Sequence, residues 1–172
     1  MSAVDLGIRA VKELLHRCNI DPETGIIDEL LFGQVLQAGA GQAPARQVAL
    51  GAGLPNTIAA TTINKVCGSS LKAVMMAANS IRAGQTQVVI AGGMESMTNA
   101  PKFEKRNGDE KEMVSTMVHD GLWDVYNDLH MGNTGEIIAN ECNISREEMD
   151  SFAARSQPVS YTHLTLPTTC TV

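Results

Sequence analysis

Cys67 is the residue of this sequence whose type and neighbours are best suited to chemistry. It ends a stretch rich in β-branched residues and is followed by Gly68, two serines and a series of helix formers. A thiol at such a strand-to-helix turn lies beside the unpaired N–H groups of the helix start, which favour the thiolate. The helix dipole adds only about 0.3 to 1 kcal/mol, or roughly 2 in a partly buried site. A full nucleophile therefore needs a second group, such as a base, that these neighbours do not supply.

A packing role is the alternative for this cysteine, because a free thiol behaves as a small apolar side chain and is often buried. The neighbouring residues favour a functional thiol instead. Gly68 allows a tight bend, and Ser69 or Ser70 can cap the following helix, which together direct the sulfur outward. Position alone leaves both interpretations open.

Composition excludes several classes of protein. The 172 residues are 44% hydrophobic and 19% charged, which predicts a globular chain with a buried core. A net charge of -6, with scattered basic residues, predicts no nucleic-acid partner. The four cysteines have neither zinc-site spacing nor the density of a secreted scaffold, so we expect no metal site and a cytoplasmic location. With no signal-like segment and no apolar run near 20 residues, no membrane partner is expected.

The hydrophobic periodicity predicts an α/β fold. An amphipathic helix is expected over residues 3–19, a strand over 27–36, and a short helix from Pro44. The helix predicted over 69–83 is apolar nearly all round, which is typical of a buried central helix. A wholly apolar strand follows at 88–91, and strand, helix and strand in this order predict a parallel crossover unit.

A change of composition near Met97 predicts a domain boundary. Residues 101–111 are rich in charge and turn formers and have no apolar period. Helices are expected again over 134–142 and from Ser145, where Ser145 and Glu148 form a capping box, to about residue 156. The predicted organisation is an α/β domain over 1–97 and part of a second domain over 98–157.

Residues 158–172 differ in character from the rest of the chain. They are crowded with threonine and carry no charged residue apart from His163. The string resembles translated sequencing adapter, so we predict that it is not native and leave it out of functional reasoning. An exposed edge strand is the alternative, although Pro158 and Pro167 limit strand pairing.

Four separated motifs occur in order along the chain. They are VLQAGAGQAPARQ at residues 35–47, the Cys67 turn, AGGMESM at residues 91–97, and His130-Met131-Gly132. In this combination they resemble the thiolase family, most of all its acetyl-CoA acetyltransferase branch, from about residue 3 to about residue 157. The resemblance implies an incomplete first α/β half of a thiolase, a mixed sheet with a buried central helix, plus part of the family's inserted loop domain.

The resemblance also implies acyl transfer through a covalent intermediate on Cys67. The thiolate would take an acetyl group from acetyl-CoA, and a second, deprotonated acetyl-CoA would attack it to give acetoacetyl-CoA and CoA, or the reverse thiolysis. Coenzyme A thioesters are then substrates, and no cofactor is implied. The positions matching the family's CoA pocket are Leu122, His130 and Met131, which without the resemblance indicate loop packing and a solvated histidine. Relatives are dimers or tetramers, so a homo-oligomer is expected.

Several features of a complete thiolase have no match in the sequence. They are a Gly-His-Pro histidine, an asparagine that positions a water, and a second reactive cysteine, all in the family's second half. We therefore expect an N-terminal fragment with little or no turnover. The alternatives are a non-catalytic CoA-binding fragment and a half protein without a stable fold. Ser70, where many relatives have glycine, also occurs in degradative 3-ketoacyl-CoA thiolases. A ketoacyl synthase shares the architecture, but the motifs favour a thiolase.

Overall fold

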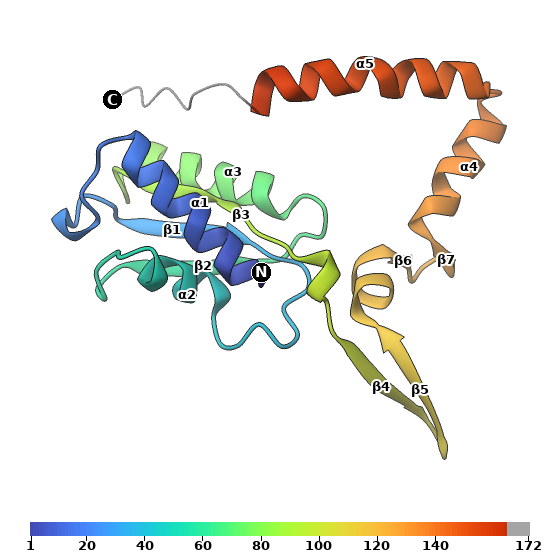
Figure 1. Cartoon of the computed structure of the whole chain (residues 1–172), viewed down its shortest axis with the longest axis horizontal. Coiled ribbons are helices and arrows are strands. Elements are labelled where there is room, and N and C mark those ends of the chain that lie inside the picture. Colours follow the sequence, from blue (N-terminus) through green and yellow to red (C-terminus); the bar gives the residue numbers. More distant parts are fainter. Residues whose placement is uncertain (165–172) are drawn as a thin grey trace. The chain divides into compact units, whose positions relative to one another are not determined.

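A computed structural model describes the backbone of residues 1–164 and the side chains of residues 1–159. The chain forms two compact units, one from Met1 to Gly121 and one from Leu122 onward. The main elements of the first unit are α1 (Ala3–Arg17), β1 (Glu29–Gly33), α2 (Pro44–Gly51), β2 (Ala59–Ile63), α3 (Ser69–Arg82), β3 (Val89–Gly93), β4 (Lys102–Asn107) and β5 (Glu110–Ser115) (Figure 1). Short 3-10 turns lie at Pro22–Thr24 and Met97–Asn99, and a π-helical turn lies at Met117–Leu122.

Helix α1 begins at a capping box formed by Ser2 and Asp5. The Ser2 Oγ accepts the Asp5 N–H at 3.1 Å, and the Asp5 carboxylate accepts the Ser2 N–H at 3.0 Å. Hydrogen bonding of the Asp5 carboxylate to the side chain and the backbone N–H of Ser2 favours its charged form and lowers the pKa of Asp5. The predicted amphipathic helix is confirmed, since Val11 and Leu15 are buried while its other face is exposed.

Strands β1, β2 and β3 form a parallel sheet in the order β2-β1-β3. The register aligns Gly33 at the end of β1 with Ile63 of β2 and Gly93 of β3, so all three strands end at the same edge. The chain crosses from β1 to β2 through α2 and from β2 to β3 through α3. The predicted parallel crossover is therefore confirmed, and it passes over β1.

Helices cover both faces of this sheet (Figure 1). Leu30 and Phe32 of β1 pack in a core with α1 and α2, whereas Leu31 packs in a second core with α3. This alternation follows from the period of two in a strand. Strand β1 is thus the centre of an α/β/α arrangement, and the α/β class is confirmed.

Two details of the expected fold differ from the structure. The sheet was expected to be mixed, but its three described strands, β1, β2 and β3, are all parallel. Helix α3 buries Ser69, Ala73 and Ala77, yet Leu71 and Val74 remain 66% and 49% exposed. A helix that is apolar all round needs cover on both sides, and here the sheet covers only one. The expectation of a fully buried central helix is therefore wrong for the described residues.

An antiparallel hairpin, β4–β5, occupies the segment for which the sequence predicted only a charged, turn-rich boundary. Its strands pair from Lys102 opposite Ser115 to Asn107 opposite Glu110. Gly108, at a φ of 63°, opens the two-residue turn, as glycine favours in such hairpins. The strands are mostly exposed and charged, so they lack the apolar alternation that identifies a strand.

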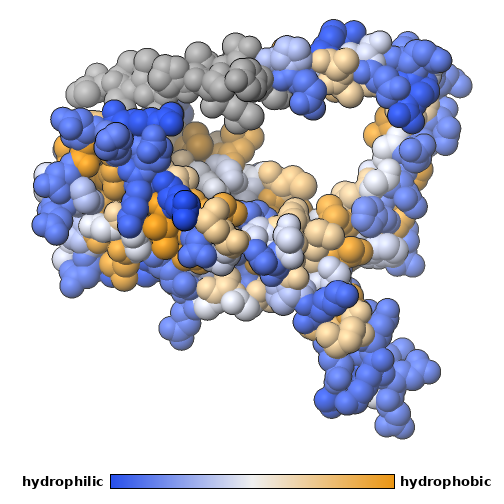
Figure 2. Space-filling view, viewed as in Figure 1, coloured by the Kyte–Doolittle hydropathy of each residue, from blue (hydrophilic) through white to orange (hydrophobic). Residues whose placement is uncertain are grey.

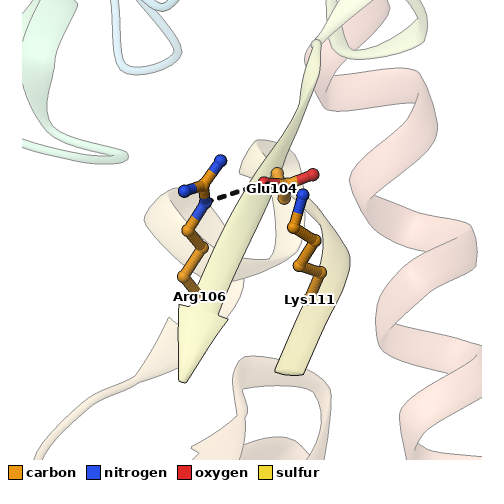
Figure 3. A network of polar contacts seen from close by, with 3 residues as sticks. All are labelled: Glu104, Arg106 and Lys111. Atoms are coloured by element: carbon orange, nitrogen blue, oxygen red, sulfur yellow. Dashed lines mark hydrogen bonds and ion pairs between the residues drawn. The ribbon is translucent and has the colours of Figure 1, made fainter. Parts of the chain in front are cut away.

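Charged side chains pair across one face of this hairpin (Figure 3). The Arg106 Nε donates to Glu104 Oε1 at 2.9 Å, and the Lys111 Nζ lies 3.5 Å from the same oxygen. Figure 2 shows a hydrophilic surface over the far end of the hairpin. Exposed pairs of this kind stabilise a protein by about 0 to 1 kcal/mol each, so the hairpin's fold depends mainly on its backbone ladder.

The second unit contains β6 (Trp123–Asp124), β7 (Leu129–His130), α4 (Met131–Glu141) and α5 (Arg146–Leu164). The predicted capping box is confirmed, because Glu148 Oε2 accepts the Ser145 N–H at 2.8 Å and Ser145 Oγ accepts the Glu148 N–H at 3.2 Å. The expected helix end near residue 156 is wrong, since α5 continues through Pro158. Proline removes one backbone donor but leaves the following residues free to be helical.

Residues 165–172 lie outside the described residues, and the non-native origin of 158–172 stays a prediction, as does the domain boundary near Met97. None of the helices among the described residues combines the length and the hydrophobicity that a membrane span requires.

Candidate active site

The first turn of α3 packs directly on the carboxyl edge of the parallel sheet. A Cβ added to Gly33 would lie 2.7 Å from both the Ser69 Cβ and the Ser70 backbone nitrogen. A Cβ on Gly93 would lie 2.9 Å from the Gly33 carbonyl oxygen and would also collide with the Ser70 hydroxyl. Glycine at these two strand ends therefore permits the close approach that fixes the start of α3.

Cys67 lies in the turn between the end of β2 and the start of α3. It is a free thiol, and the residue is exposed. The predicted strand-to-helix turn is therefore present, and the sulfur is accessible to a reagent from solvent. The carboxyl ends of parallel strands are where α/β proteins usually bind ligands, which suits a thiol that must meet a substrate.

The turn contains a strained residue directly before the thiol. Val66 has a φ of 46°, in the left-handed region that a β-branched residue rarely adopts. Its N–H donates to Asn64 Oδ1 at 3.0 Å, and its carbonyl oxygen accepts from the Ser69 Oγ at 2.6 Å. Ser69 Oγ also accepts the Lys65 N–H at 2.8 Å. Both polar groups of the Val66 backbone are thus bonded to side chains.

The predicted role of the serines needs correction. Helix α3 has Gly68 as its N-cap, and no side chain caps it. Ser69 is 4% exposed and bonds back to the loop that precedes the helix. A hydroxyl one residue inside the helix can reach the preceding turn, and here the buried Ser69 does so.

Two further side chains join the three loops that follow the strands. Glu95 Oε2 accepts the backbone N–H groups of Val35 and Leu36 at 2.8 and 3.2 Å. The Asn64 Nδ2 donates to the Val35 carbonyl at 3.3 Å. Sequence reasoning did not single out Asn64 or Glu95. The side chain of an asparagine often bonds the backbone two residues later in a turn, and this pattern could have indicated Asn64. The role of Glu95 depends on a contact with a residue 60 positions away, which no local pattern indicates.

No base is bonded to the thiol within the described part of the first unit. His119 Nδ1 lies 2.7 Å from Asp120 Oδ1, and its ring packs edge-on against Phe103 with centroids 5.3 Å apart. His16 lies on the exposed face of α1. Among the described residues no hydrogen bond connects Cys67 to either histidine. Neither histidine therefore supplies the base that a full nucleophile needs.

Leu122, His130 and Met131, the predicted CoA-contacting residues, all lie in the second unit. Trp123 pairs with His130 in the antiparallel ladder of β6 and β7. Leu122 precedes Trp123 and Met131 follows His130, so both lie at the same end of that ladder. The structure thus brings these three together with one another, while Cys67 belongs to the first unit.

His130 also caps helix α4. Its Nδ1 accepts the Gly132 N–H at 2.9 Å, which leaves Nε2 as the ring nitrogen free to meet a ligand. Met131 is 41% exposed. Helix α4 begins at Met131, three residues before the predicted start at residue 134, because the His130 side chain caps it. Across the described residues, no three His, Cys, Asp or Glu side chains are grouped so as to hold a metal ion.

Comparison with known proteins defines the class. Residues 1–162 match the family described as thiolase, N-terminal domain. The chain therefore belongs to the thiolase family, as its motifs predicted.

Three relatives show the similarity in more detail. The chain is 50% identical over 161 residues to acetyl-CoA acetyltransferase 2 of Arabidopsis thaliana, covering 91% of this chain and 40% of the relative. It is 52% identical over 161 residues to acetyl-CoA acetyltransferase of Cupriavidus necator, covering 90% and 40%. It is 48% identical over 161 residues to a probable acetyl-CoA acetyltransferase of Escherichia coli, covering 91% and 40%. The chain thus spans about 40% of the length of these relatives.

Proposed function

We propose that this chain supplies the nucleophile and part of the CoA-binding surface of an acetyl-CoA acetyltransferase. The observation that carries the proposal is the free, exposed Cys67 at the start of α3 in a chain of the thiolase family. Its sequence identity of 50% and 52% to two proteins named acetyl-CoA acetyltransferase supports acetyl as the transferred group. A cytoplasmic location and self-association into a dimer or tetramer belong to the same proposal.

The proposed reaction has two covalent halves. The Cys67 thiolate attacks the carbonyl carbon of acetyl-CoA, so that a new thioester forms on the enzyme and the CoA thiolate leaves. A base removes a proton from the methyl group of a second acetyl-CoA, and the resulting carbanion attacks the acetyl–cysteine. The new carbon–carbon bond gives acetoacetyl-CoA, and Cys67 leaves as the thiolate. Thioester exchange between two thiolates costs little free energy, which is why cysteine suits both directions.

We further propose that the chain alone carries out little or no turnover. The carbon–carbon step needs a base, and no histidine is bonded to Cys67 within the described part of its unit. The sequence contains no Gly-His-Pro segment that would match the family's histidine. Acylation of Cys67 needs no deprotonated carbon, so it is the step that the chain could retain.

Mass spectrometry after exposure of the purified chain to acetyl-CoA tests the nucleophile. Tryptic cleavage after Lys65 and Lys72 isolates Cys67 in a peptide without another cysteine. We expect an acetyl adduct on this peptide, absent in Cys67→Ser, and none on Cys142. Absence of the adduct from the natural chain would contradict the acyl–cysteine proposal. A spectrophotometric assay of acetoacetyl-CoA thiolysis tests turnover, and a rate near that of a complete thiolase would contradict the second proposal.

A second candidate function is CoA binding without turnover. It is favoured by the position of Leu122, His130 and Met131 at one end of the β6–β7 ladder. Titration calorimetry with CoA distinguishes the two functions, since saturable binding by Cys67→Ser without any acetyl adduct on the natural chain supports a binder.

A further inference from the structure

Side chains on both sides of Val66 bond its backbone, and its carbonyl oxygen also accepts the Ser69 backbone N–H at 3.0 Å. At a φ of 46° the valine side chain crowds its own backbone, and this region is disfavoured by about 5- to 30-fold in population for residues other than glycine. Asn64 and Ser69 bond the Val66 N–H and carbonyl groups respectively. Neither bond can form in the same way if Val66 relaxes to an ordinary conformation, because both peptide groups would rotate.

The two bonding side chains are themselves fixed to the sheet. Asn64 is anchored through its donor bond to the Val35 carbonyl in the loop after β1. Ser69 is 4% exposed and stands against Gly33 at the end of β1. Asn64 and Ser69, which we call the clamp on Val66, therefore fix this residue relative to the edge of the sheet. Val66 immediately precedes Cys67.

We propose that Asn64 and Ser69 are positioning residues for the thiol: by holding Val66 in the left-handed conformation, they set the direction of the Cys67 side chain at the start of α3. This inference rests on the proposed function in one respect: the fixed direction of the sulfur serves to present it to an acyl donor. In this role both residues act through the backbone of Val66.

Asn64→Ala is the most direct test, because Asn64 is exposed and its truncation leaves no cavity. Asn64→Asp is the matched control, since it keeps an oxygen that accepts the Val66 N–H while losing the amide donor. The decisive variant is Asn64→Ala combined with Val66→Gly. Glycine adopts the left-handed region without steric cost, so it should remove the need for the clamp.

The readout is the rate of Cys67 alkylation by iodoacetamide in the full chain, measured on the tryptic peptide that contains it. Each rate is divided by the rate of the same variant in denaturant, and Cys142 in the second unit serves as an internal control. We expect Asn64→Ala to lower the normalised rate at Cys67 by about fivefold or more, which is the lower end of the conformational preference of Val66. Asn64→Asp keeps the acceptor for the Val66 N–H but loses the anchoring donor, so its rate should lie between those of Asn64→Ala and the natural chain. Adding Val66→Gly to Asn64→Ala should restore the rate.

An unchanged or higher rate in Asn64→Ala would overturn the proposal. Failure of Val66→Gly to restore a lowered rate would also overturn it, because Asn64 would then act by another route. Ser69→Ala, alone and with Val66→Gly, repeats the test from the carbonyl side, and circular dichroism verifies that each variant is folded. Alkylation does not require acetyl-CoA, so this test can fail or succeed independently of the acetyl adduct that tests the proposed function.

Discussion

Val35 and Glu95 are separated by 60 positions and joined by a 2.8 Å hydrogen bond from the Val35 N–H to Glu95 Oε2. The carbonyl of the same valine accepts from Asn64. The loop after β1 is therefore held between the loop after β2 and the loop after β3. Because Cys67 follows Asn64 in the second of these loops, the hydrogen bonds of Val35 connect the nucleophile turn to the rest of the sheet edge.

Glu95→Ala should destabilise the first unit by about 1 to 3 kcal/mol, since two partly buried backbone N–H groups lose their acceptor. Glu95→Gln should cost less than half as much, because the amide oxygen still accepts although without a negative charge. Chemical denaturation followed by circular dichroism measures both. Glu110→Ala, an exposed site at the hairpin turn, is the control and should stay within about 0.5 kcal/mol. Equal losses for the Ala variants at 95 and 110 would rule out the bracing role.

Gly33→Ala should destabilise the first unit by about 1 to 3 kcal/mol, as is usual for overpacking. The new Cβ would lie 2.7 Å from the backbone nitrogen of Ser70, so the start of α3 would have to shift. Gly135→Ala is the matched control, because that glycine lies inside α4 with nothing within 4 Å of a Cβ. It should raise stability by about 0.5 to 1 kcal/mol. Thermal melts of both variants test this, and a neutral Gly33→Ala would show that α3 can move away from the sheet edge.

The sequence predicted those parts of the fold in which the hydrophobic periodicity agrees with the glycines and prolines that end helices and strands. Helices α1, α2 and α3 and the strand before Cys67 were expected within a few residues, because apolar spacing and glycine or proline mark them. The β4–β5 hairpin was missed since its exposed strands are charged on both faces. The continuation of α5 through Pro158 was missed because the charge pattern of the helix ends there and residues 158–172 were set aside as non-native.

The candidate site was only partly predictable for a similar reason. The placement of Cys67 at a strand-to-helix turn follows from local residue types, and the motifs identified the family. The hydrogen bonds of Asn64, Ser69 and Glu95 depend on where the strand ends meet in space. The left-handed conformation of Val66 had no local signal, since valine is among the residues least expected there.

His130 combines two roles that substitutions can separate. Its Nδ1 caps α4 by accepting the Gly132 N–H, and Nε2 remains available to a ligand. His130→Asn should preserve the helix, because asparagine is a favoured N-cap, whereas His130→Ala should lower the stability of α4 by about 1 kcal/mol. If the imidazole contacts CoA, both variants should bind CoA more weakly than the natural chain. Calorimetry and circular dichroism together measure the two effects. Unchanged CoA affinity in His130→Asn would remove His130 from the proposed binding surface.

Asp28 should make the stability of the first unit depend on pH below neutrality. The Val88 and Gln87 N–H groups donate to its Oδ2 at 2.9 and 2.6 Å, and these two bonds, Val88 first, lower the pKa of Asp28. An aspartate in the unfolded chain has a pKa of about 3.9. Near and below this pH the unfolded state therefore binds more protons than the folded state. The stabilisation is therefore complete above that value and is lost as pH falls through the lower folded pKa.

The free energy of unfolding, measured by urea titration from pH 7 down to about pH 3, tests this contribution. Asp28→Asn should reduce stability at pH 7 and flatten the slope between about pH 5 and pH 3, because the amide cannot titrate. Asp109→Asn, in the exposed hairpin turn of the same unit, is the control for loss of a carboxylate and should change stability at pH 7 by no more than about 0.5 kcal/mol. A slope that is identical in Asp28→Asn and in the natural chain would mean that the bonds from β3 to Asp28 do not favour its charged form in solution.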